Sequence, residues 1–84
     1  MNEDWQFILN ESSVHFLLGC RTKQRESLIQ ALRELANNPH QRGDYRAHDS
    51  TGRTVQIKLA SGCLISFWAD SYVKELRVIR IERV

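Results

Sequence analysis

Apolar and polar residues alternate most regularly between residues 53 and 59. Val55, Ile57 and Leu59 occupy every second position, and the side chains between them are polar. A period of two is typical of a half-buried strand with one apolar face and one wet face. We therefore expect Gln56 and Lys58 on the wet face of this strand, and residues 55, 57 and 59 against the core.

Two more strands are predicted after it. Residues 60–62 indicate a hairpin turn, because Gly62 can adopt the positive φ of a tight turn without steric cost. Residues 63–69 are apolar on both faces, which favours a central strand. Residues 74–84 form the last strand, after a loop at 70–73. Strands spaced this closely predict an antiparallel meander.

The first half of the chain has a different period. Residues 5–9 are apolar strand formers, and residues 14–18 form a short apolar run that is compatible with helix or strand, with helix favoured by the capping residues before it. Residues 22–37 carry apolar side chains at helical spacing, with Thr22 as the expected cap, and Pro39 ends this helix. Residues 45–48 can add a short strand.

This order of elements predicts the fold class. Helices precede most of the strands, which favours an α+β layer fold. We expect two N-terminal helices packed on a mainly antiparallel four-stranded sheet, in the order β-α-α-β-β-β. All 84 residues belong to one domain.

Composition narrows the function classes. The chain is 42% hydrophobic and 26% charged, which is ordinary for a globular protein. Its length of 84 residues leaves no room for a deep pocket around a large cofactor. Cys20 and Cys63 are too few and too far apart for a zinc site, so we expect two reduced, buried thiols, no metal and no cofactor. There is no run long enough to span a membrane, and Glu3 and Asp4 replace the basic start of a leader, so a cytoplasmic location is expected.

The net charge of +2 alone predicts no strong nucleic-acid binding. However, Lys74, Arg77, Arg80 and Arg83 gather on the last predicted strand. Such charges are most simply read as solvated side chains that protect an exposed strand edge from pairing. The functional alternative is a stripe that contacts phosphates.

Known catalytic motifs are absent from the sequence, which has no glycine-rich phosphate loop and no nucleophile elbow. The remaining candidate is the wet face of the sheet, where Lys58 and Gln56 are expected near Ser66 and Trp68, with arginines at its borders. Cations there could neutralise a phosphate, and an aromatic ring could stack on a base of single-stranded RNA. The alternative is a face that meets only water or a partner protein.

The chain resembles the RelE/ParE superfamily of bacterial toxin–antitoxin systems. The resemblance covers nearly the whole chain, and it is carried by the first strand, the helical hairpin ending in Leu35-Ala-Asn-Asn-Pro39, the strand and turn 53–62, and the closing segments 63–70 and 74–83. It implies a small toxin that a cognate antitoxin protein neutralises. Members of the RelE type cut mRNA in the ribosomal A site, and members of the ParE type poison DNA gyrase.

The resemblance also suggests roles for individual residues. Lys58 matches a lysine of the RelE-type strand, whereas Gln56 and Leu64 stand where a lysine and an arginine are expected, and Arg83 corresponds to a further arginine. The C-terminal catalytic tyrosine has no counterpart. The resulting catalytic set for a metal-independent endoribonuclease is Lys58, Arg53 and Arg83, with Trp68 or His48 in place of the tyrosine. Expected nucleic-acid contacts are Arg46, His48, Trp68, Arg77 and Arg80. The incomplete set leaves a second interpretation open, a catalytically inactive binding module with the same fold.

Overall fold

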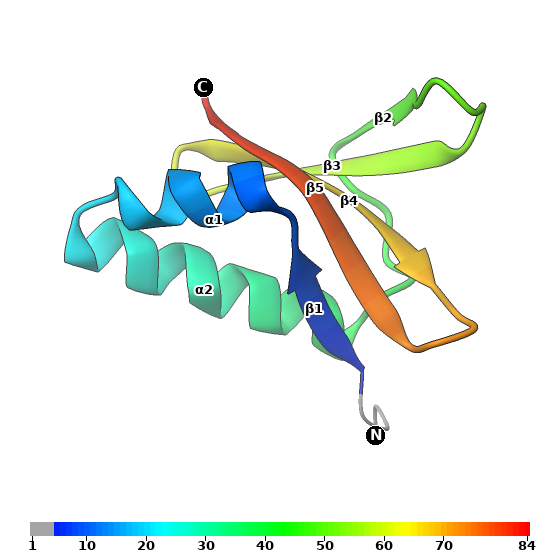
Figure 1. Cartoon of the computed structure of the whole chain (residues 1–84), viewed down its shortest axis with the longest axis horizontal. Coiled ribbons are helices and arrows are strands. Elements are labelled where there is room, and N and C mark those ends of the chain that lie inside the picture. Colours follow the sequence, from blue (N-terminus) through cyan, green and yellow to red (C-terminus); the bar gives the residue numbers. More distant parts are fainter. Residues whose placement is uncertain (1–4) are drawn as a thin grey trace.

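The computed structural model describes residues 5–84, so Glu3 and Asp4, on which the expectation about a leader rests, lie outside the described residues. Seven elements follow one another along the chain (Figure 1). They are β1 (Gln6–Leu9), α1 (Glu11–Leu18), α2 (Thr22–Asn37), β2 (Tyr45–His48), β3 (Thr54–Ala60), β4 (Cys63–Asp70) and β5 (Glu75–Arg83). The fold is therefore α+β, as predicted.

The sheet is mixed and has five strands, in the order β1-β5-β4-β3-β2. β2, β3, β4 and β5 form an antiparallel meander, and β1 joins its far edge parallel to β5. The prediction of four strands was too low, because residues 45–48 pair along their whole length with residues 54–57. The parallel pairing arises because the helical hairpin separates β1 from the meander.

Both helices lie on one face of the sheet (Figure 1). The predicted apolar stripe of α2 is confirmed, since Leu28 and Leu32 are fully buried and Leu35 is nearly so. They pack in one cluster with buried side chains from β4 and β5. The strand members of this cluster are Cys63, Ile65, Phe67, Leu76, Val78 and Ile81. β2 and the distal part of β3 extend past the helices in the view of Figure 1.

The ends of the helices explain their positions. α1 begins after Asn10, whose side chain accepts a hydrogen bond from Ser13 N, so the run at 14–18 belongs to a helix. Thr22 is the first helical residue of α2 and not its cap, and Arg21 occupies the cap position without a side-chain hydrogen bond. Asn38, just before Pro39, leaves the helical region with φ −141° and ψ 67°.

Candidate functional site

The register of the β3–β4 hairpin determines which side chains share a face. Ser61 and Gly62 form its two-residue turn, and both have a positive φ. Gln56 lies opposite Phe67 and Lys58 lies opposite Ile65. Because directly paired residues point to the same side, both polar residues face the helices together with the core.

The expected grouping of Gln56 and Lys58 with Ser66 and Trp68 was therefore wrong. Ser66 pairs with Ile57, and it lies on the side of the sheet away from the helices, which we call the open face. A two-residue turn places even positions of β3 opposite odd positions of β4, which produces this arrangement. The apolar residues of β3 thus belong to the open face.

The open face has a small apolar layer of its own. Val55 is only 4% exposed, yet it is outside the cluster that packs on the helices. Ala47 of β2 lies directly opposite Val55. The next pair on the same face is Tyr45 with Ile57. The open face is therefore partly apolar rather than uniformly wet.

Trp68 is the centre of a cationic cluster on the open face. The guanidinium carbon of Arg53 lies 3.9 Å from the centre of the Trp68 ring, and that of Arg77 lies 5.9 Å from it. Arg77 reaches the ring because it pairs directly with Trp68 in the β4–β5 register. Contacts of this kind contribute about 0.5–1 kcal/mol each at exposed sites. We call Arg53, Trp68 and Arg77 the arginine–tryptophan cluster.

Each arginine of the open face also has an acidic neighbour. Arg53 lies 3.4 Å from Asp49, and Arg77 lies 2.7 Å from Glu75 and 3.4 Å from Asp70. The arginine side chains remain 45% and 41% exposed, respectively. Ion pairs this exposed contribute about 0–1 kcal/mol, so an incoming phosphate can compete with the carboxylates.

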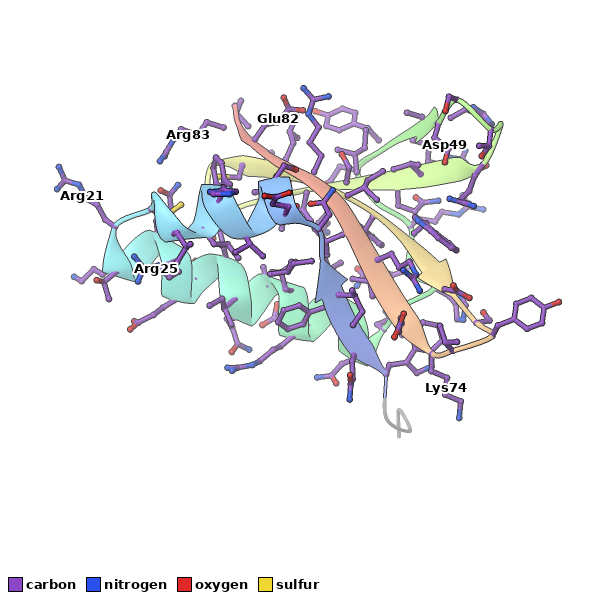
Figure 2. The ribbon with its side chains drawn as sticks, in the orientation of Figure 1. Arg21, Arg25, Asp49, Lys74, Glu82 and Arg83 are labelled. Atoms are coloured by element: carbon purple, nitrogen blue, oxygen red, sulfur yellow. The ribbon has the colours of Figure 1, made fainter. Side chains whose placement is uncertain are left out.

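A hydrogen-bonded turn positions Arg53. Asp49, labelled in Figure 2, accepts hydrogen bonds from the backbone N–H groups of Thr51 and Arg53, both at 2.9 Å, and from the Thr51 hydroxyl at 2.6 Å. The Thr51 hydroxyl, followed by these two N–H groups, lowers the pKa of Asp49 below its usual 3.8. The turn therefore holds a charged carboxylate beside Arg53, directly before β3.

A pocket of about 370 Å³ adjoins this cluster. Its walls come from the segment after α2 and from the ends of β3 and β4. The lining residues are Pro39, His40, Gln41, Arg53, Thr54, Gln56, Phe67, Trp68 and Ala69. Gln56 is fixed there because its Oε1 accepts a hydrogen bond of 2.8 Å from Gly43 N.

The three residues predicted as catalytic are not brought together. Arg83 donates a hydrogen bond of 3.0 Å to Gln24 Oε1 and lies 5.3 Å from the centre of the Phe16 ring, so it is held against the helices. Lys58 lines a different, smaller pocket beside Glu34 of α2. Arg53 belongs to the open face, on the other side of the sheet. A single phosphate cannot contact all three cations in this arrangement.

The predicted nucleic-acid contacts divide between the two faces as well. Trp68, Arg77 and Arg80 share the open face, where Arg80 pairs with Ser66 and forms an ion pair of 3.5 Å with Glu82. Arg46 and His48 pair with Gln56 and Thr54, which places them on the opposite side of β2. Both are exposed.

Two contributors to the site were not anticipated. His40 lines the pocket and meets Trp5 edge-on, with ring centres 5.3 Å apart. Asp49 anchors the turn before Arg53. The spacing of Asp49, Thr51 and Arg53 is a signal for such a turn, since an aspartate commonly accepts from the backbone two residues later. Nothing in the sequence indicates that His40 approaches β3 or β4.

Within residues 5–84, no group of His, Cys, Asp and Glu side chains is arranged to hold a metal ion. No helix in this part of the chain combines the length and apolarity needed to cross a bilayer. No family model matches the chain, and neither a curated protein nor a solved structure matches it significantly.

Proposed function

We propose that this chain is a RelE/ParE-like toxin of a bacterial type II toxin–antitoxin system. In this proposal the toxin acts in the cytoplasm by binding single-stranded RNA of translated messages, and a cognate antitoxin protein neutralises it. The observation that carries the proposal is the Trp68 ring on the open face with Arg53 at 3.9 Å and Arg77 at 5.9 Å. The order of elements, with a helical hairpin between β1 and a closing meander, agrees with the family resemblance.

The chemistry of the arginine–tryptophan cluster supports RNA as the target. Proteins bind single-stranded RNA by stacking bases on aromatic rings and by placing cations along the backbone. The cluster combines both features on a face that no helix covers (Figure 1). Arg80, 67% exposed on the same face, extends the cationic surface toward the end of β5.

RNA binding is a better-supported activity than RNA cleavage, because the residues predicted as catalytic do not meet at one phosphate. Metal-free RNA cleavage requires cations around one phosphate and a group that moves protons. Arg83 is held by Gln24 and Phe16, whereas Arg53 lies over Trp68 on the other face. The proposed toxin therefore blocks translation by occupying RNA.

Induced expression in a bacterium tests the proposal. We expect the wild-type chain to arrest growth and to reduce incorporation of labelled methionine, and co-expression of a small partner protein encoded beside it to restore both. The double variant Arg53→Gln/Arg77→Gln should lose the effect. Arg33→Gln provides a matched control, because Arg33 is exposed on α2, on the opposite side of the sheet.

Two other outcomes identify other functions. Growth arrest with intact translation and altered plasmid supercoiling would indicate the gyrase-directed activity of the ParE type. Normal growth at high expression, with no RNA binding even at low salt, would indicate a catalytically inactive binding module. The separation of Lys58 and Arg83 from Arg53 is the observation that favours this second candidate function.

A further inference from the structure

The pocket beside the arginine–tryptophan cluster has the properties of a site for one nucleobase. We propose that it receives an unstacked base of single-stranded RNA while Arg53 at its border contacts the adjoining phosphate. This inference names the ligand of the proposed toxin surface and so rests on the proposed function. The volume of about 370 Å³ lies at the lower end of the range of small-molecule sites, about 300–1,000 Å³.

The lining of the pocket is suited to a flat, partly polar ligand. Phe67 is fully buried at the pocket and Pro39 is buried beside it, so part of the lining is apolar and well packed. Aromatic groups come from Trp68 and His40. Bases that leave a stack are commonly held between aromatic or apolar side chains and read through hydrogen bonds at their edges.

Gln56 supplies the hydrogen bond that reads the base. Its Oε1 accepts from Gly43 N at 2.8 Å, which fixes the orientation of the amide. The Nε2 group makes no hydrogen bond to residues 5–84 and remains a donor at the pocket. A donor in this place favours the carbonyl oxygen or ring nitrogen of a base.

The segment that carries Pro39, His40 and Gln41 is closely packed on β3. A Cβ at Gly43 would lie 2.5 Å from the carbonyl oxygen of Ile57, so the segment after α2 packs directly on the backbone of β3. The pocket is therefore formed before a ligand arrives, which lowers the entropy lost on binding. Arg53, held by Asp49 and lying over Trp68, places a cation at one side of this preformed pocket.

NMR titration with a single-stranded RNA pentamer tests the inference. The control ligand is the same pentamer without bases, which keeps the phosphates. We expect the RNA to shift the indole N–H of Trp68 and the side-chain amide of Gln56, and the abasic pentamer to bind at least tenfold more weakly. Equal affinity for the two pentamers would overturn the proposal.

Gln56→Glu is the matched variant. Glutamate keeps an oxygen that accepts from Gly43 N and removes the Nε2 donor, and the Gly43 amide shift verifies that the loop is retained. We expect Gln56→Glu to weaken RNA binding at least tenfold while affinity for the abasic pentamer falls much less. A parallel loss for both ligands would indicate only charge repulsion and would contradict base recognition.

Growth assays separate the two proposals. If Gln56→Glu binds both pentamers as the wild type does and still arrests growth, the base site is wrong and the toxin proposal stands. If the wild type does not arrest growth yet binds the RNA pentamer through Gln56, the base site stands and the toxin proposal fails.

Discussion

Gly43 packs against the backbone of Ile57, and a Cβ at Gly43 would lie 2.5 Å from the Ile57 carbonyl oxygen and 2.7 Å from its nitrogen. These atoms belong to the main chain of β3, so a side-chain rotation cannot relieve the contact. The segment after α2 follows its course along β3 because residue 43 has no side chain. The same contact holds Gly43 N within hydrogen-bond distance of Gln56.

Gly43→Ala should therefore destabilise the protein. Inserting a methyl group into a tightly packed contact costs about 1–3 kcal/mol. Urea denaturation of the wild type and the variant measures this loss. Gly19→Ala is the control, since its added Cβ would have neighbours no closer than 3.6 Å. Equal stability of Gly43→Ala and the wild type would contradict the close approach.

Asn10 connects the start of α1 to β5 through two separate hydrogen bonds. Its Oδ1 accepts from Ser13 N at 3.0 Å, and its Nδ2 donates to the Ile79 carbonyl oxygen at 2.8 Å. Asn10→Ala removes both and should lower the free energy of unfolding by about 1–2 kcal/mol. Asn10→Asp keeps the cap and loses only the donor, so it should fall between the wild type and Asn10→Ala in the same urea experiment. If Asn10→Asp is as unstable as Asn10→Ala, the cap contributes nothing.

The sequence predicts the elements well because their periods differ clearly. The stripe of Leu28, Leu32 and Leu35 and the alternation at Val55, Ile57 and Leu59 indicate a helix and a strand, and both are present. β2 is less evident, since it has only four residues and all of their side chains are exposed. Its partner strand determines that it is a strand.

The faces of the sheet are harder to predict than the strands. A period of two shows that the faces of β3 differ, but it does not show which one the helices cover. Here the apolar set containing Val55 lies on the open face, and Lys58 lies on the helix side. The pairing of Arg77 with Trp68 likewise depends on the irregularity between Ser66 and Phe67 in the β4–β5 register, which sequence periodicity does not indicate.

Cys63 should make the stability of the fold depend on pH in the alkaline range. The residue is fully buried, and burial raises the pKa of its thiol above 9.0. The folded state therefore retains its proton to a higher pH than the unfolded state does. This contribution to stability is fully present below pH 9.0 and is lost as the pH rises through the folded pKa.

Cys63→Ala isolates this effect from other alkaline titrations. We expect the wild type to be more stable than the variant at pH 7, because alanine leaves a small cavity. The difference in unfolding free energy should narrow above pH 9.0, where the unfolded wild type releases its thiol proton. Urea denaturation of both proteins between pH 7 and pH 10.5 measures the gap, and a constant gap would mean that the Cys63 pKa is unshifted.

Asp49 should control the arginine–tryptophan cluster at acidic pH. The hydroxyl of Thr51 and the N–H groups of Arg53 and Thr51 lower the Asp49 pKa below 3.8. The charged carboxylate therefore supports the turn above pH 3.8, and that support is lost as the pH falls through the folded pKa. In an NMR pH titration, the amides of Thr51 and Arg53 should shift with a common midpoint below 3.8. The Trp68 indole should follow the same midpoint, because Arg53 loses the carboxylate that holds it over the ring.

Asp49→Asn should abolish the titration in all three signals. A midpoint at or above 3.8, or an indole signal that does not move, would show that the turn does not position Arg53.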